Sequence, residues 1–308
     1  MVHVLLCYAK IEAGEAPGNR TANPDSMAFH TLVSAQELAA HLNDPSWRVF
    51  DCRHDLARPE TGEQAYREAH LPHAQFLHLD RDLSARPTGR NGRHPLPEPA
   101  ALAAKLGQCG VSNDTQVVAY DDAGSMYAVR LWWLLRWLGH EKVAVLDGGL
   151  PAWQRAGYPL TGDVPNIRPA VFAWRLREKP VDTAYIEARL RDPDLVLLDG
   201  RGADRFRGEN ETLDPVGGHI PGAANRPFRN NVTADGRFKP GPQLRREFQD
   251  LLKGKPVENV VAYCGSGVTA CHNLLALELA GLHGARLYAG SWSEWCSDAQ
   301  RPVATGTE

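Results

Sequence analysis

The chain has 308 residues, of which 43% are apolar, and a formal net charge of −3 with both signs spread along it. At about 150 residues per domain, this length predicts two folded domains. The near-neutral charge argues against nucleic acid or an anionic membrane as a partner. No apolar run approaches the roughly 20 residues that span a bilayer.

Residues 1–27 are predicted to be a poorly ordered extension. Residues 2–9 are apolar, but they are few and lack the basic start of a signal peptide. Residues 10–25 are rich in glycine, proline, asparagine and charge. Whether residues 1–26 belong to the native protein stays open, because Met27 is an alternative start.

The six cysteines show no pattern of a metal site or a disulfide framework. They form no Cys-x-x-Cys pair and no cysteine–histidine cluster with zinc spacing. In a chain of this length they indicate a reducing compartment. We therefore expect a cytoplasmic protein without a metal or other cofactor. The cysteines are Cys7, Cys52, Cys109, Cys264, Cys271 and Cys296.

The first half, residues 28–156, alternates apolar strands with amphipathic helices. Strands are predicted at 48–52, 116–121 and 143–147, and helices at 99–106 and 127–138. Strands separated by helices predict a mainly parallel sheet flanked by helices, an α/β fold. The helix at 127–138 carries Trp132, Trp133 and Trp137, which we expect to pack in the core or between domains rather than to bind a ligand.

Residues 157–180 are predicted to connect the two domains. They contain four prolines and no periodic apolar pattern. Proline favours extended chain over helix.

The second half, residues 181–305, repeats the same alternation. Strands are predicted at 195–199, 259–263 and 286–288, and helices at 183–191, 242–252 and 270–280. Four segments recur in the same order: 49–53 as 197–201, 70–74 as 219–223, 117–120 as 260–263, and 146–149 as 288–291. This order indicates duplication of one domain of about 130 residues.

Cys264 follows a predicted buried strand and precedes a predicted helix. The loop between them consists of small residues, including Gly265 and Gly267, which let backbone N–H groups turn toward the sulfur. The positive end of the helix dipole adds to this effect. Both favour thiolate over thiol, so Cys264 is the predicted nucleophile.

The equivalent position in the first half is occupied by aspartate. Tyr120 aligns with Tyr263, which places Asp121 where Cys264 stands. A carboxylate cannot act as a sulfur nucleophile, so the first half is predicted to be catalytically inactive. We expect one active site, at the carboxyl ends of the second sheet's strands, with the first domain supplying one wall.

These features resemble a two-domain rhodanese-type sulfurtransferase over nearly all of residues 30–303. Residues 66–74, 219–223, 264–270 and 287–295 carry the resemblance. The loop Cys-Gly-Ser-Gly-Val-Thr-Ala resembles that of the 3-mercaptopyruvate sulfurtransferases. Rhodaneses that prefer thiosulfate usually have bulkier basic residues where Gly265 and Ser266 stand here.

The resemblance implies a covalent mechanism with a Cys264 persulfide. A small-molecule donor, 3-mercaptopyruvate or alternatively thiosulfate, gives sulfur to Cys264, and a thiol, cyanide or thioredoxin-like acceptor removes it. The loop residues Gly265, Ser266, Gly267, Val268 and Thr269 are expected to bind the sulfur, and Arg205 the donor's carboxylate. Arg201 is expected to form a structural ion pair, as Arg53 does in the first half.

Two further points follow from the resemblance. Mercaptopyruvate enzymes often carry a second arginine within the stretch equivalent to 209–218, which has none here; Arg229 is a weak substitute. His70 is expected either to hold a turn, as its counterpart His219 does, or to join Ser266 and an acidic residue in a proton relay.

Two rival functions were weighed. A cysteine phosphatase of related fold needs an arginine six positions after the cysteine, where this chain has Ala270. A rhodanese module that only binds partners would not need Cys264 and Arg205.

Overall fold

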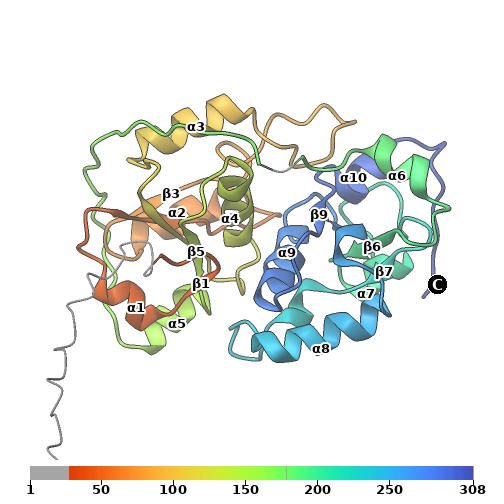
Figure 1. The fold of residues 1–308 in the computed structure, drawn as a ribbon. Helices are drawn as coiled ribbons and strands as arrows, with labels where there is room; N and C mark the ends of the chain where they lie inside the picture. Colours follow the sequence, from red (N-terminus) through yellow and green to blue (C-terminus); the bar gives the residue numbers. More distant parts are fainter. Residues whose placement is uncertain (1–27, 178, 308) are drawn as a thin grey trace, which may run out of the picture.

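The structure is a computed structural model that describes residues 28–177 and 179–307. The predicted extension, with Cys7, lies outside the described residues. The described chain forms two α/β lobes side by side, each built on its own sheet (Figure 1). The prediction of two tandem parallel-sheet domains is confirmed.

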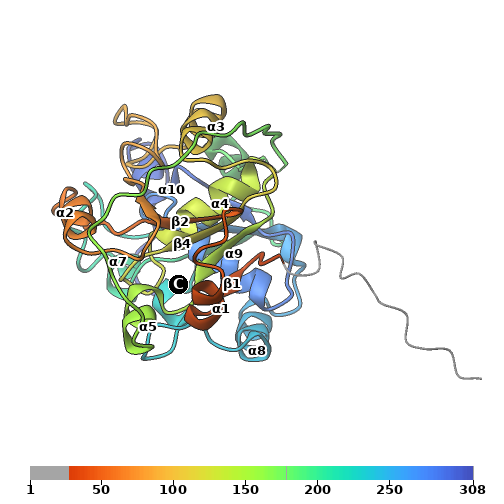
Figure 2. The same ribbon diagram turned by 90° about the vertical axis from the view of Figure 1, so that its left-hand side faces the viewer.

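The first domain holds a five-stranded sheet in the order β1-β5-β4-β2-β3, in which all pairs are parallel. Its strands are β1 (Leu32–Val33), β2 (Trp47–Asp51), β3 (Ala74–Phe76), β4 (Gln116–Tyr120) and β5 (Val143–Leu146). Its helices are α1 (Ala35–Ala40), α2 (Thr61–Glu68), α3 (Pro99–Gln108), α4 (Ala128–Trp137) and α5 (Gly149–Arg155). Figure 2 views this domain from its outer side, with α3 above the sheet and α1 and α5 below it.

The second domain has a four-stranded parallel sheet in the order β7-β6-β8-β9. Its strands are β6 (Val196–Asp199), β7 (Ala224–Asn225), β8 (Val260–Tyr263) and β9 (Arg286–Leu287). Its α-helices are α6 (Thr183–Arg189), α7 (Ala203–Arg207), α8 (Gly241–Leu252), α9 (Ala270–Leu279) and α10 (Ser291–Trp295). Short 3-10 helices span Phe228–Asn231 and Val257–Asn259.

Helices cover both faces of each sheet, which explains why the central strands are apolar throughout. In β8, Val260 and Ala262 face the core shared with α8 and α9, whereas Val261 and Tyr263 face α6, α7 and α10. This alternation is the two-residue period of a strand. The pairing of Asp51 with Tyr120 in the first sheet is repeated by Asp199 with Tyr263 in the second.

The predicted connection, residues 157–180, has no helix among its described residues and runs along the first domain past α3 (Figure 1). Thr161 bridges to His70, and the amide of Ala170 donates to the carbonyl of Gly107 at 2.8 Å. The connection is therefore fastened to the first domain before it enters the second.

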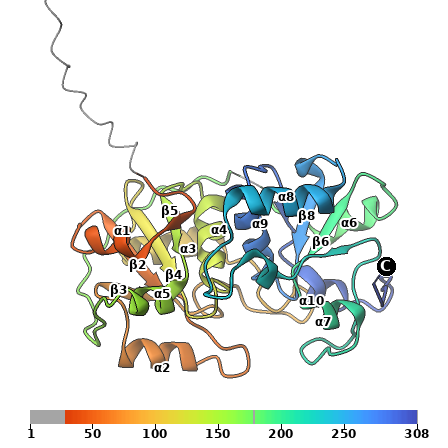
Figure 3. The same ribbon diagram turned by 90° about the horizontal axis from the view of Figure 1, so that it is seen from below.

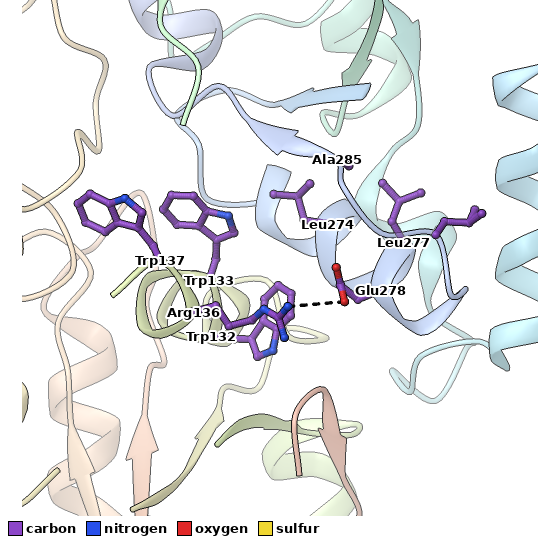
Figure 4. Close-up of a pocket in the computed structure, with 9 residues that line it drawn as sticks. Trp132, Trp133, Arg136, Trp137, Leu274, Leu277, Glu278 and Ala285 are labelled. Carbon is purple, nitrogen blue, oxygen red and sulfur yellow. Dashed lines mark ion pairs between the residues drawn. The ribbon is translucent and has the colours of Figure 1, made fainter. Parts of the chain in front are cut away.

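The two domains meet where α4 packs against α9 (Figures 1 and 3). Trp132, Trp133 and Trp137 are buried in one apolar cluster that continues into Leu274 and Leu277 of the second domain. A small pocket lies between these helices, and the Arg136–Glu278 ion pair at 3.7 Å spans it (Figure 4). The prediction that the tryptophans serve packing is confirmed.

No helix within the described ranges is both long enough and apolar enough to span a lipid bilayer.

Candidate active site

Cys264 lies directly after β8, at the carboxyl end of the sheet, and only 2% of its surface is exposed. Its Sγ accepts a hydrogen bond from the amide of Gly267 at 3.2 Å. Gly267 has a φ of 78°, and a Cβ there would collide with the carbonyl oxygen of Ala289. A glycine is therefore required for the loop to curl beneath the sulfur.

The helix α10 holds the loop from the other side. The amide of Cys264 donates to Ser291 Oγ at 3.1 Å, and the carbonyl oxygens of Cys264 and Gly265 accept from Trp292 and Ser293. The backbone of the nucleophile is thus fixed at both ends, which limits the motion of Sγ to its own side-chain torsion.

A pocket opens above the cysteine, and both domains line it. The predicted loop residues Gly265, Ser266, Val268 and Thr269 lie in its wall together with Arg205, and Gly267 lies beneath the sulfur. The first domain contributes Leu56, Arg93, Met126 and Tyr127. The site therefore lies in the cleft between the domains.

Two arginines stand over the loop, whereas only Arg205 was expected from the sequence. A Cβ placed on Gly265 would lie 2.8 Å from Arg93 Nη2 and 3.6 Å from Arg205 Nη1. Arg93 comes from the first domain, whereas the stretch 209–218 of the second has no arginine. Arg229, the weak substitute, is exposed, lies over the ring of Phe228 and is not among the residues that line the pocket.

Buried carboxylates orient both arginines. Glu211 accepts from Arg205 at 2.8 and 3.0 Å, and Asp214 bridges Arg205 and Arg93. Burial alone would raise the pKa of Glu211, but two backbone amides and Arg205 lower it below its usual value. Arg205 Nη1 and Arg93 Nη2 have no hydrogen-bond partner in the described chain, so both remain available to a bound anion.

Ser266 forms a relay with His94 and Asp80, not with His70. His94 Nδ1 lies 2.6 Å from Ser266 Oγ, and His94 Nε2 lies 3.1 Å from Asp80 Oδ1. A carboxylate can only accept, so neutral His94 carries its proton on Nε2, and Nδ1 accepts from the serine. Burial lowers the pKa of His94, and Asp80 opposes this shift.

His70 does not reach the site. Its ring is fully buried against Tyr66, and its two nitrogens lie 2.6 and 3.1 Å from the carbonyl oxygens of Tyr66 and Asp163. His219 is stacked in the same way on Phe206. Both histidines hold equivalent turns, so the structural alternative for His70 is correct and the catalytic one is wrong.

Arg201 makes the expected structural ion pair with Asp199, as Arg53 does with Asp51. The side chain of Arg207 pairs with the exposed Glu209 and points away from the pocket lining.

Arg130 on α4 joins the parts of the site across the domain boundary. It is fully buried, and its guanidinium donates to the carbonyl of Gly267 at 3.0 Å and to that of His94 at 3.0 Å. No carboxylate in the described ranges pairs with it, and burial lowers its pKa. Its charge is therefore directed at the cysteine loop. Its only signal in the sequence is a charge within an apolar helix.

The loop of the first domain is built in the same way around Asp121. Its carboxylate accepts four amide hydrogen bonds of 2.7–2.9 Å, from Ala123, Ser125, Tyr127 and Ala128. Burial raises the pKa of Asp121, and amide donors oppose the rise. The loop fold is thus retained without the thiol.

One group among the described residues has metal-ligand spacing: His54, His78 and Asp80, in the first domain. It adjoins the relay through Asp80.

The class of this protein is defined by two tandem parallel-sheet domains and by a cysteine loop of the second domain that faces the cleft between them. A family model described as a rhodanese-like domain matches residues 34–156 and 182–298. The chain belongs to the rhodanese family.

Its named relatives are sulfurtransferases. A probable 3-mercaptopyruvate sulfurtransferase of Pseudomonas aeruginosa is 53% identical, over 91% of this chain and all of the relative. A thiosulfate sulfurtransferase of Rattus norvegicus is 37% identical, over 87% and 92% of the two chains. The structure of a 3-mercaptopyruvate sulfurtransferase from Leishmania major aligns with a TM-score of 0.77 and 30% identity, over 86% of this chain and 74% of the other.

Proposed function

We propose that this sulfurtransferase takes sulfur from 3-mercaptopyruvate and passes it to a thiol-type acceptor through a persulfide on Cys264. The observation that carries the proposal is the position of the sulfur beneath two arginine side chains with free N–H groups. Residues 181–305 are assigned to the catalytic half and residues 28–156 to the inactive one, because Asp121 replaces the cysteine there.

In the first step the Cys264 thiolate attacks the donor's sulfur. A new S–S bond forms, the C–S bond breaks, and its electron pair passes to the carbon that becomes the methyl group of pyruvate. The donor's thiol proton ends on that carbon. Ser266 Oγ, held 2.6 Å from His94 Nδ1, is the group placed to carry a proton in this step.

Arg205 Nη1 and Arg93 Nη2 would hold the donor's carboxylate. The cluster around them is balanced: Arg93, Arg201 and Arg205 face Asp199, Glu211 and Asp214. Because it offers donors without excess charge, it suits a monoanionic carboxylate better than dianionic thiosulfate. In the second step an acceptor thiolate attacks the outer sulfur and releases Cys264. A thiolate mechanism of this kind fits a reducing compartment such as the cytoplasm.

Thiosulfate remains a second candidate donor, and one observation favours it: two cations rather than one approach Gly265. Steady-state rates with both donors at equal acceptor distinguish the two. Higher kcat/KM with 3-mercaptopyruvate supports the proposal, and higher kcat/KM with thiosulfate overturns the donor assignment.

Cys264→Ser tests the nucleophile. A serine hydroxyl cannot form a persulfide, so the variant should neither gain the mass of one sulfur atom after donor treatment nor transfer sulfur. Cys109→Ser, a change at a partly exposed thiol of the first domain, serves as the control and should do both. Sulfur transfer by Cys264→Ser at more than a few per cent of the native rate would refute the assignment.

A further inference from the structure

We propose that His54, His78 and Asp80 form a binding site for a divalent transition metal of the zinc and cobalt type, and that a metal bound there slows sulfur transfer by engaging Asp80. The three residues follow β2 and β3, which are parallel neighbours, so both loops leave the same edge of the sheet. One potential ligand atom of each lies within 4.8 Å of the others.

The two imidazoles are suited to this role. His54 is 7% exposed, and neither of its ring nitrogens has a hydrogen-bond partner in the described chain. His78 is 2% exposed, and its Nδ1 accepts a long 3.1 Å hydrogen bond from the amide of Asp80. That bond places the proton on Nε2, so a metal at Nδ1 would displace the amide hydrogen bond in order to take this lone pair.

Asp80 would supply a negative charge to the metal, and its exposed side chain marks the side from which a metal ion can enter. Its Oδ2 lies 3.9 Å from His54 Nε2 and 4.0 Å from His78 Nδ1, and its side chain is 41% exposed. Ligand atoms of a tetrahedral zinc site stand roughly 3.4 Å apart, as follows from metal–ligand bonds of about 2.1 Å. The Asp80 oxygen lies about half an ångström beyond that spacing from each histidine nitrogen, so metal binding would require small movements of the carboxylate and of the imidazoles.

The surroundings fit a histidine ligand as well. The carboxylate of Glu60 stands 4.0 Å from His78 Nε2, beyond hydrogen-bond distance, and its side chain is 65% exposed, so rotation of Glu60 could bring it within reach of this nitrogen. A carboxylate that accepts a hydrogen bond from the outer nitrogen of a metal-bound histidine is a common arrangement. Two imidazoles and one carboxylate suit zinc, cobalt or nickel rather than magnesium or calcium.

The two oxygens of Asp80 face different partners. Oδ2 faces His54 and His78, whereas Oδ1 accepts from His94 of the relay. A metal on Oδ2 would withdraw charge from the carboxylate and weaken its hold on His94, and Ser266 would then lose its proton acceptor. This part of the inference rests on the proposed function; metal binding itself does not.

Binding is tested with Co²⁺ in the full-length Cys264→Ser variant, which removes the thiol that lines the pocket as a competing ligand. One Co²⁺ per chain should bind, with visible d–d bands and no thiolate charge-transfer band. Adding His54→Gln or Asp80→Asn should abolish these bands. His283→Gln, at an exposed histidine that pairs with Glu278, is the matched control and should leave them unchanged.

Two different substitutions are used so that a folding defect in one of them does not decide the result. Asparagine closely matches aspartate in shape and Asp80 is partly exposed, so Asp80→Asn should fold like the native protein. Absence of stoichiometric binding, a thiolate band, or binding that survives both substitutions would overturn the site.

Coupling is tested by the rate of sulfur transfer in the protein with Cys264 intact, first without metal and then at saturating Co²⁺. The native rate should fall about tenfold or more, and the His54→Gln rate should fall much less. Equal inhibition of both proteins would overturn the coupling. Absence of transfer before any metal is added would instead count against the proposed function.

Discussion

At the scale of single residues, the donor site depends on two arginines that approach one glycine. Arg205 comes from α7, and Arg93 comes from the loop that the first domain extends over the pocket. Loss of a hydrogen bond to a charged group costs about 1.5–3 kcal/mol. We therefore expect Arg93→Ala and Arg205→Ala each to reduce kcat/KM for 3-mercaptopyruvate by roughly ten- to a hundredfold.

Arg90→Ala is the control for this prediction, because Arg90 is exposed on the same loop. It should leave kcat/KM within about twofold of the native value, the range of a surface change. If Arg93→Ala behaved like Arg90→Ala, the carboxylate would be bound by Arg205 alone.

The histidine assignments can be separated by two matched substitutions. His94→Gln removes the proton acceptor beside Ser266 and should lower kcat with little change in thermal stability. His70→Gln disrupts a buried turn and should lower the melting temperature while each folded molecule keeps its kcat. The reverse pattern would restore His70 to the relay.

The pH dependence of the relay follows from the pKa of His94. Burial lowers this pKa, so the neutral, proton-accepting form persists below the usual value of about 6.5. The acid limb of the kcat/KM profile should therefore lie below pH 6.5. Asp80→Asn removes the carboxylate that opposes the shift, and should move this limb further toward acid while lowering the plateau. A limb at or above 6.5 would contradict this assignment.

At the scale of elements, α4 connects the first domain to the chemistry of the second. Arg130 on this helix positions the carbonyls of His94 and Gly267 at once. Arg130→Met should lower kcat more than it changes KM, because it removes positive charge and alignment at the loop but leaves Arg93 and Arg205 in place. Arg136→Met, one turn and a half further along the helix, is the control and should affect stability only. Equal effects of the two substitutions on kcat would disprove the positioning role.

The longer elements could be predicted from the sequence because burial on both faces leaves a continuous apolar run or a helical period. Strand β8 and helices α4, α8 and α9 begin and end within one or two residues of the predictions. Short elements such as β1, α7 and α10 were not predicted. With two to five residues each, they contain too few positions to show a period.

The site could be predicted only where its residues sit in the second half. Cys264 and its loop were predicted from the strand–loop–helix pattern, and Arg205 from the resemblance to rhodanese-type sulfurtransferases. Arg93 and His94 lie between β3 and α3, in a long stretch with no periodic pattern, and they reach the pocket only because that stretch crosses to the second domain. A contact of this kind depends on the tertiary structure, so it produces no recognisable pattern in the local sequence.

At the scale of the whole molecule, a buried histidine links the two domains. His272 on α9 donates from Nε2 to the carbonyl of Gly124 at 3.1 Å, and its Nδ1 accepts from Asn231. Burial lowers the pKa of His272 to about 4. Protonation would require Nδ1 to give up its bond to Asn231.

Stability should therefore fall as the pH drops below 6.5. Between about pH 6.5 and pH 4, His272 binds a proton in the unfolded chain but not in the folded protein. The free energy of unfolding therefore falls on acidification, by on the order of 3 kcal/mol in total. His272→Gln should flatten the fall of the melting temperature from pH 7 to pH 5, and the exposed His283→Gln should not. Identical slopes in all three proteins would rule out this contribution.

The carboxylate of Asp121 fills an anion-binding loop that its own chain provides. By the offset of 143 residues, the amides of Ser266, Val268, Ala270 and Cys271 correspond to these four donors in the sequence. Around Cys264, the amide of Gly267 donates to Sγ, and the amide of Cys271 donates to the carbonyl of Val268. The reduced thiol extends less far than a carboxylate, whereas a persulfide adds an outer, anionic sulfur at about that reach. We expect sulfur loading to act on the second domain as ligand binding does, because the persulfide would occupy its loop as the carboxylate of Asp121 occupies that of the first domain. Melting curves of sulfur-loaded and sulfur-free protein should therefore differ, with the loaded form unfolding at the higher temperature.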